Sequence, residues 1–235
     1  MRRHRDPDGG RLLRFWITCR PALAVVLGCV AVLTALAPQA GARNAAEVVR
    51  EVQRRYDSTR DYSAEFHQTT EYRTLNRSIS GRGSFYFSRP GKMLWRYEEP
   101  AGQFVLSDGR HLYFYQPAER QVIKTAVRGA FRSDLPLSFL LGIGKLERDF
   151  RAELLEGSAD GHRLRLIPRR ANTGLREIIL TADAERYDIR QVRIEDGGGN
   201  LWTFGFENIR RGVVLDPSVF RLKVPQGVDI VEFGS

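Results

Sequence analysis

Three histidines and a pair of carboxylates are the first residues of this chain to consider for chemistry. His67, His111 and His162 could bind a metal ion or act as general bases, but they are far apart and form no metal-ligand motif. The pair Glu98-Glu99 could supply an acid and a base, but it falls at a predicted turn, where solvation explains it. The sequence also has no nucleophile elbow, phosphate loop or dinucleotide fingerprint. We therefore expect no enzyme, no metal site and no cofactor.

Arg89 is the residue whose surroundings are unusual. It lies within residues 81–117, which hold nine aromatic residues in 37 positions. A guanidinium group in an apolar setting must find acceptors, because leaving it unpaired costs about 3–5 kcal/mol. Its five N–H donors suit the exposed carbonyls of a helix end or a loop. The alternative is a solvated arginine at the end of a strand.

The elements that position these residues begin with a helix. Asn44 is a predicted N-cap, and Glu47 can complete a capping box. Apolar residues then recur at helical spacing until the helix is expected to end near Arg60-Asp61. This apolar stripe consists of Ala45, Val48, Val49, Val52 and Tyr56. A second helical segment is expected from about Ser133 to Leu141, and a short helical turn within residues 145–150.

From Tyr62 onward the apolar period changes to two, which indicates strands. Turn residues such as Arg89-Pro90-Gly91 and Asp108-Gly109 separate the runs. The expected strands lie around residues 62–72, 85–87, 93–97, 104–106, 112–114, 153–156, 162–168, 177–181, 189–195, 201–207 and 220–222. We therefore predict a mainly β fold with helices (α+β): a strongly curved, incomplete antiparallel β-barrel of about 11 strands, capped by a helical lid.

Residues 1–42 have the anatomy of a cleaved signal peptide. Six arginines precede an apolar run of about 15 residues, which is shorter than the roughly 20 that span a bilayer. Small residues then allow cleavage after Ala40 or Ala42. A retained anchor and lipidation of Cys29 are the alternatives. The two cysteines, Cys19 and Cys29, both lie in this segment, so no disulfide is expected in the rest of the chain.

Residues 43–235 are expected to form a single domain. The leader holds six arginines and two aspartates, so the net charge of +9 falls to +5 after its removal. The basic residues are scattered and acidic residues lie between them, whereas a nucleic-acid site would be clustered. We therefore expect no nucleic-acid partner.

Short sequence islands within residues 45–230 resemble one known family. They are, in chain order, 62–68 (YSAEFHQ), 81–83 (GRG), Arg89-Pro90 followed by Leu94-Trp95, Pro100, 106–109 (LSDG), 112–117 (LYFYQP) and 225–228 (PQGV). Together they resemble the periplasmic outer-membrane lipoprotein carriers of the LolA family. Residues 118–215 match only weakly.

The resemblance implies a lipid-binding carrier without catalysis. Members of this family have an incomplete, strongly curved barrel, capped by helices, around an apolar cavity. The chain would then be a monomeric periplasmic chaperone that binds the acyl chains of lipoproteins released by an inner-membrane ABC transporter. It would deliver them to an outer-membrane receptor lipoprotein. By position, Arg89 corresponds to the family's lid latch, and Met93 to a residue that contacts the transporter and the cavity mouth.

The remaining site residues are assigned to the cavity wall and to the lid. The predicted acyl-binding residues are Phe66, Phe85, Phe87, Met93, Leu94, Trp95, Leu106, Leu112 and Phe114. The predicted lid residues are Leu137, Phe139, Leu140 and Leu141. Alternate residues of a strand point to opposite faces, so which of these line the cavity, and which pack as core, stays open.

Three other functions stay open. A regulatory domain on the same fold could sense mislocalised lipoproteins or lipids, a lipid-modifying enzyme could act on acyl esters, and a carrier could take another lipid or glycolipid. The sequence identifies neither the cargo lipoproteins nor a dedicated outer-membrane receptor.

Overall fold

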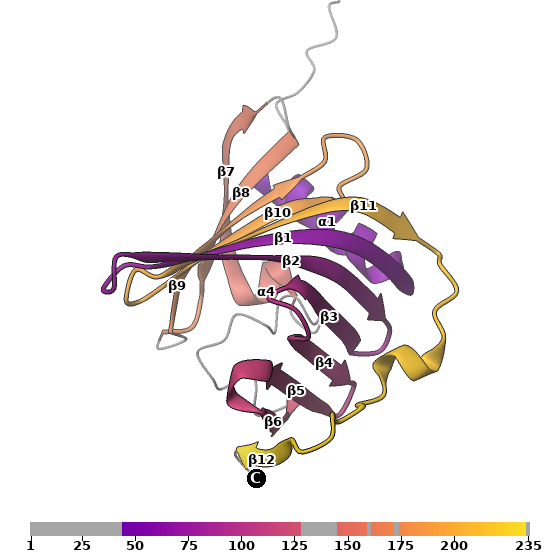
Figure 1. Ribbon diagram of the computed structural model, residues 1–235. Helices are drawn as coiled ribbons and strands as arrows, with labels where there is room; N and C mark the ends of the chain where they lie inside the picture. The colour runs from indigo at the N-terminus through magenta and orange to yellow at the C-terminus, as the bar shows by residue number, and fades with distance from the viewer. Residues whose placement is uncertain (1–43, 128–144, 159–160, 172–173, 234–235) are drawn as a thin grey trace, which may run out of the picture. The chain divides into compact units, whose positions relative to one another are not determined.

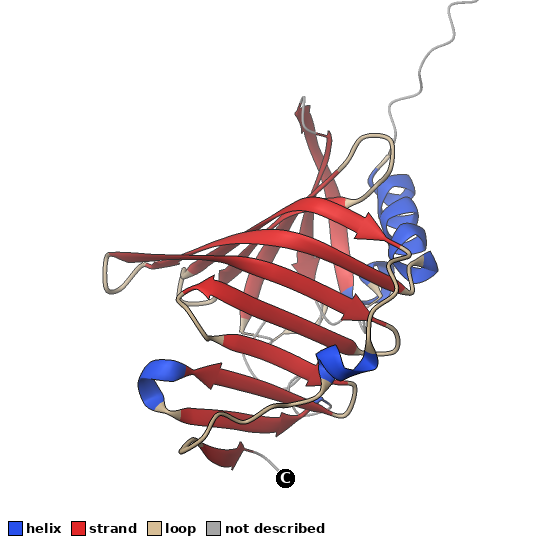
Figure 2. Cartoon of the chain, turned by 45° about the vertical axis from the view of Figure 1, so that its right-hand side comes forward, coloured by secondary structure: helices blue, strands red, loops and turns tan. Residues whose placement is uncertain are grey.

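A curved β-sheet surrounds an apolar interior, and helix α1 covers part of its concave face (Figures 1 and 2). The computed structural model describes residues 44–127, 145–158, 161–171 and 174–233. The predicted signal peptide and the predicted second helical segment lie outside these ranges. The same is true of the four predicted lid residues, Leu137, Phe139, Leu140 and Leu141. The described residues belong to one compact unit.

Helix α1 (Ala45–Ser58) begins with the predicted capping box. The Asn44 side chain accepts a hydrogen bond from the Glu47 backbone amide at 2.9 Å, and the Glu47 carboxylate accepts one from the Asn44 amide at 3.2 Å. These bonds satisfy two donors that the start of a helix otherwise leaves free. The valines of the apolar stripe are buried against the sheet: Val48, Val49 and Val52. The predicted helix is confirmed, and it ends at Ser58.

Within the described ranges, twelve strands form one sheet, in the order β12-β6-β5-β4-β3-β2-β1-β11-β10-β9-β8-β7. The sheet does not close on itself, because β12 and β7 are its two edges among the described strands. The strands are β1 (Asp61–Tyr72), β2 (Arg77–Ser88), β3 (Lys92–Glu99), β4 (Phe104–Asp108), β5 (His111–Gln116), β6 (Gln121–Ala126), β7 (Phe150–Ser158), β8 (Gly161–Pro168), β9 (Leu175–Ala182), β10 (Ile189–Asp196), β11 (Leu201–Arg211) and β12 (Asp229–Phe233). The short helices are η1 (Pro117–Glu119), α4 (Leu146–Asp149) and η2 (Pro217–Phe220).

The prediction of an entirely antiparallel sheet of about 11 strands needs correction. Neighbouring strands are antiparallel except that β12 runs parallel to β6. Neither β6 nor β12 was expected from the sequence. In β6, Val122 is buried on one face and Ile123 faces the cavity on the other, so the apolar residues do not alternate with polar ones. A strand that packs on both faces lacks the period-two signal.

The predicted last strand, residues 220–222, is also wrong, because η2 occupies the start of this segment. The Asp216 side chain accepts a hydrogen bond from the Ser218 amide, and Pro217 follows the cap, where its fixed φ suits a helical turn. The short helical turn expected within residues 145–150 is confirmed as α4.

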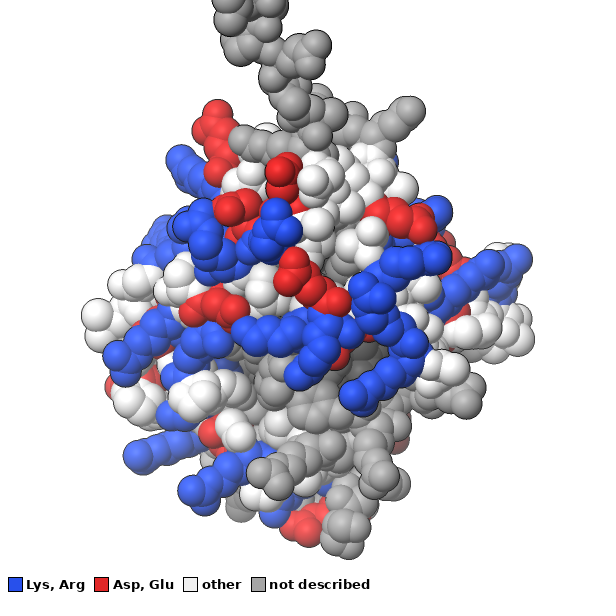
Figure 3. Space-filling model, turned by 180° about the vertical axis from the view of Figure 1, so that it is seen from behind, with Lys and Arg blue, Asp and Glu red and all other residues white. Residues whose placement is uncertain are grey.

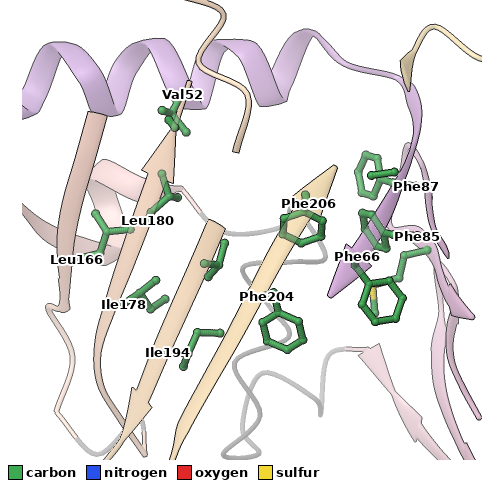
Figure 4. Packing of buried hydrophobic residues seen from close by; sticks show 14 of the residues in the cluster. Val52, Phe66, Phe85, Phe87, Leu166, Ile178, Leu180, Ile194, Phe204 and Phe206 are labelled. Atoms are coloured by element: carbon green, nitrogen blue, oxygen red, sulfur yellow. The ribbon is translucent and has the colours of Figure 1, made fainter. Parts of the chain in front are cut away.

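Two apolar clusters lie on opposite faces of the sheet. The larger cluster fills the concave face and includes residues of α1 and of both halves of the sheet, such as Val52, Leu180 and Phe85, which Figure 4 labels. The smaller cluster lies on the other face of β3, β4, β5 and β6, where η2 packs against β3 and β4. Its buried residues are Leu94, Leu106, Tyr113, Tyr115, Val122 and Phe220. The segment from η2 to β12 therefore covers the convex face.

The charged side chains are mixed in sign on the face that Figure 3 shows, with acidic groups between the basic ones. The ion pairs among the described residues include Arg165 with Glu177 at 3.3 Å and Arg176 with Glu195 at 2.8 Å. In the part of the chain that the structure describes, no helix has both the length and the apolar character needed to cross a bilayer.

Candidate functional site

The concave face contains a cavity of about 720 Å³ beside the ends of β1 and β2 that meet at their turn. Strands β1 to β6, β10 and β11 all contribute to its wall. The wall is mainly apolar, with Trp95, Val105, Leu112, Phe114, Trp202 and Phe204 among its residues. A cavity of this size falls in the range of about 300–1,000 Å³ that is usual for small-molecule sites.

Seven of the predicted acyl-binding residues lie on the concave side. Three of them line the cavity: Trp95, Leu112 and Phe114. The other four are almost completely buried in the core cluster beside it: Phe66, Phe85, Phe87 and Met93. Met93 is 0% exposed, so in this structure it does not lie at a cavity mouth or on a surface that a partner could contact.

Leu94 and Leu106 do not line the cavity, which corrects the prediction for these two residues. They are cross-strand partners in β3 and β4, and both belong to the cluster on the convex face. The reason is the pleat of the strands: Trp95 and Val105 point to the cavity, so their immediate neighbours in sequence point away from it. Sequence alone did not show which set of alternate residues faces inward.

An aromatic stack forms the inner boundary of the cavity. The Trp95 ring lies 4.5 Å from the Phe85 ring, 4.7 Å from the Phe66 ring and 5.2 Å from the Phe204 ring, measured between centroids. These tilted and edge-on contacts are the arrangements that aromatic rings prefer. Phe66 and Phe85 therefore pack directly against the Trp95 ring.

Residues of the second half of the chain complete the wall, and none of them was among the predicted site residues. Ile194 of β10 with Trp202 and Phe204 of β11 face the cavity opposite β3 to β5. The alternation of apolar residues predicted strands here, but the family resemblance is weak in this part of the chain, so no site residues were assigned to it. The long-range pairing of β1 with β11 brings them to the site.

Arg89 finds the acceptors that its charge requires at the C-terminal end of α1. Its Nε donates to the Thr59 carbonyl at 3.0 Å, and its Nη2 donates to the Tyr56 carbonyl at 2.9 Å. The guanidinium also lies over the Tyr56 ring, 5.1 Å from the centroid. A cation at this position satisfies carbonyls that the end of a helix leaves free. The expectation that Arg89 serves a helix end is confirmed.

Asp57 joins Arg89 to the residue that follows the undescribed segment 128–144. Its carboxylate accepts a hydrogen bond from Arg89 Nη2 at 3.2 Å and one from Lys145 Nζ at 2.7 Å. Next to this pair, the Leu146 amide donates to the Gln53 side chain at 2.9 Å. Partial burial acts to raise the pKa of Asp57, but its hydrogen bonds and the two cations lower the pKa below its ordinary value. The carboxylate therefore stays ionised near neutral pH.

An ion triad of Arg55, Asp188 and Arg211 lies on the other side of the same helix end. Asp188 accepts hydrogen bonds from Arg55 Nε at 2.9 Å and from Arg211 Nε at 2.8 Å, and Arg211 also bonds to the Thr59 hydroxyl. Burial acts to raise the pKa of Asp188, and the two arginines more than reverse this, so its pKa is lowered. These residues are far apart in sequence, and no motif signalled the triad.

Among the described residues, no group of three or more His, Cys, Asp or Glu side chains is arranged to hold a metal ion.

Comparisons with known proteins identify a family. The family model described as "Outer membrane lipoprotein carrier protein LolA" matches residues 57–223. An outer-membrane lipoprotein carrier protein of Methylococcus capsulatus is 32% identical and aligns over 75% of this chain and 83% of its own length. One from Alkalilimnicola ehrlichii is 28% identical over 91% of this chain and 95% of its own length.

Among solved structures, an uncharacterised conserved protein of Thermus thermophilus has a similar fold. Its TM-score is 0.51 at 12% identity, and the match covers 80% of this chain and 99% of that protein. By the family match and the identity of its relatives, the chain belongs to the LolA family of outer-membrane lipoprotein carrier proteins.

Proposed function

We propose that this protein is a periplasmic carrier that binds the acyl chains of lipoproteins and moves them between membranes without catalysis. The observation that carries the proposal is the cavity of about 720 Å³ with an apolar wall, found in a member of a lipoprotein carrier family. The donor would be an inner-membrane ABC transporter and the acceptor an outer-membrane receptor lipoprotein. The signal-peptide anatomy of residues 1–42 supports export to the periplasm.

The physical need for such a carrier follows from the cost of exposing acyl chains to water. Burying one methylene group contributes about 0.8 kcal/mol, so a long acyl chain in water is disfavoured by roughly 10 kcal/mol. A lipoprotein anchored by several chains cannot cross an aqueous space without cover. A cavity lined by aromatic and branched side chains supplies that cover without requiring a particular protein sequence in the cargo.

The direct test uses inner-membrane vesicles that contain acylated lipoprotein and an active transporter. We expect the purified protein to release the lipoprotein into the soluble fraction, and we expect no release of a matched lipoprotein whose acylated cysteine is replaced by serine. The complex should then transfer its cargo to outer-membrane vesicles. Absence of soluble lipoprotein while the transporter hydrolyses ATP would count decisively against the carrier function.

We further propose that Arg89 is a latch that competes with cargo. Its bonds to the Tyr56 and Thr59 carbonyls fix the end of α1, and its bond to Asp57 adds a link to Lys145. Lys145 directly follows the segment that contains the predicted lid. If cargo entry requires these bonds to break, their free energy is subtracted from the affinity for acyl chains, and release becomes easier.

Replacing Arg89 by leucine should therefore strengthen loading and slow handover. Hydrogen bonds to a charged group contribute about 1.5–3 kcal/mol, so we expect an affinity for acylated lipoprotein about tenfold higher and a slower transfer to the acceptor. Arg89→Lys keeps the charge but lacks the planar fork, and it should lie between wild type and leucine. Arg60→Leu is the matched control, because Arg60 is exposed beside the same helix end. Weaker loading with unimpaired handover would contradict the latch.

A further inference from the structure

A row of polar side chains crosses the otherwise apolar wall of the cavity. The Tyr97 hydroxyl of β3 donates a hydrogen bond to the Gln68 side-chain oxygen of β1 at 2.5 Å. Gln68 Nε2 in turn donates to the Thr70 hydroxyl at 2.9 Å. All three residues line the cavity, and Thr70 and Tyr97 are only 4% and 8% exposed. The row therefore lies inside the site.

A glycine makes this row possible. Strand β2 lies between β1 and β3, and Gly81 is the residue of β2 that pairs with Gln68. A Cβ atom at position 81 would lie 3.2 Å from Cε1 of Tyr97 and 3.0 Å from the Glu99 carbonyl oxygen, which is closer than side chains normally approach. Because Gly81 has no side chain, the Tyr97 ring can lie over β2 and reach Gln68.

The wall also carries hydrogen-bond donors, namely the side-chain amide of Gln68 and the indole N–H of Trp95. A glutamine amide has two N–H donors, and Gln68 uses one of them on Thr70. Trp95, which also lines the cavity, has a buried indole Nε1 with no hydrogen-bond partner among the described residues. Burial raises the pKa of Tyr97, so its hydroxyl keeps its proton and remains a donor. A wall that bound only hydrocarbon would gain nothing from these groups, since buried polar groups are costly without partners.

We propose that Gln68 and Tyr97 form a carbonyl subsite, so that the cavity prefers acyl chains attached through ester or amide groups to plain alkyl chains of the same length. The inference rests on the proposed function and names the chemical class of its ligand. In the loaded protein, the Tyr97 hydroxyl and the second N–H of Gln68 donate to a carbonyl oxygen of the ligand. In this structure the Tyr97 hydroxyl donates to the Gln68 oxygen, and the ligand carbonyl would replace that oxygen as its acceptor.

The test compares two lipids that differ only in their carbonyl groups. Dipalmitoylglycerol (a diester) and dihexadecylglycerol (a diether) each displace a fluorescent fatty acid from the purified protein, and the displacement gives the two affinities. We expect wild type to bind the diester about fivefold more tightly, the effect of roughly one net hydrogen bond. Tyr97→Phe and Gln68→Leu should each reduce this preference, and the double variant should remove it with the diether affinity kept.

Two further variants keep the result interpretable. Tyr113→Phe removes a hydroxyl from the convex face, where Tyr113 bonds to Asp108, and should leave the preference unchanged. Gly81→Ala should reduce the preference without removing any donor, because the new methyl group displaces the Tyr97 ring. Equal binding of both lipids by wild type, or a full preference in the double variant, would overturn the subsite and leave the carrier function standing. Failure of both lipids to bind would overturn the carrier function itself.

Discussion

Replacing Gly83 by alanine is expected to lower the free energy of unfolding by about 3 kcal/mol, at the upper end of the range for overpacking. A Cβ atom at this position would lie 2.0 Å from the Arg96 carbonyl oxygen and 2.9 Å from the Tyr97 Cα, so strands β2 and β3 would have to move apart. The close approach arises at a β-bulge, because Arg82 pairs with Glu99 while Gly83 pairs with Tyr97. Urea unfolding followed by circular dichroism measures the change.

The same substitution at Gly205 is the control. Gly205 lies in the interior of β11, and a Cβ atom there would meet no atom within 4 Å. Alanine in a strand interior is about 0.5–1 kcal/mol more favourable than glycine, so Gly205→Ala should leave the protein as stable as wild type or slightly more stable. Equal losses at the two positions would show that the contact with the Arg96 carbonyl does not decide the cost at Gly83.

Filling the cavity should abolish acyl binding while the fold persists. Thr125 of β6 lines the cavity and pairs with Leu112 of the neighbouring strand β5. A tryptophan at position 125 would occupy space that the proposed function assigns to an acyl chain. We expect Thr125→Trp to weaken binding of a fluorescent fatty acid at least tenfold, since displacing only two methylene contacts already removes about 1.6 kcal/mol. Fluorescence titration measures the affinity, and thermal unfolding checks the fold.

Thr203→Trp introduces the same side chain on the other face of the sheet. Thr203 lies in β11 between Trp202 and Phe204, which both line the cavity, so its own side chain points away. We expect its fatty-acid affinity to equal that of wild type. If Thr125→Trp binds the fatty acid as well as Thr203→Trp does, the acyl chain is held elsewhere.

Local patterns in the sequence were enough to predict most elements of the fold. The capping box at Asn44, the period-two runs and turns such as Asp108-Gly109 each depend on residues close together in the chain, and each is confirmed. Strand β6 was not predicted, because its adjacent apolar residues Val122 and Ile123 pack on opposite faces of the sheet and give no alternating pattern. The parallel direction of β12 could not be predicted, since it depends on the route of the preceding loop.

The sequence was enough to predict which strands line the cavity, but not which face of each strand points into it. Trp95, Leu112 and Phe114 line the cavity as expected, whereas Leu94 and Leu106 lie on the convex side. Both sets are apolar, because the segment from η2 to β12 covers the convex face. The residues of that face are therefore not polar, as they would be on a sheet face exposed to solvent. The polar row of Gln68 and Tyr97 could not be predicted from the sequence either, because it depends on a hydrogen bond between β1 and β3 that passes over β2.

The pairing of β1 with β11 sets an order for folding. Strands β1 to β6 are neighbours in sequence, as are β7 to β11, so each half of the sheet can form from short hairpins. Among the described strands, the two halves join where β1 pairs with β11, for example where Asn208 donates a hydrogen bond to Glu65, 143 positions away in sequence. Such distant contacts slow folding, because a long loop must close before they form. Strand β1 therefore has one unpaired edge until β11, near the end of the chain, is available to pair with it. A newly made chain is most open to aggregation in that interval.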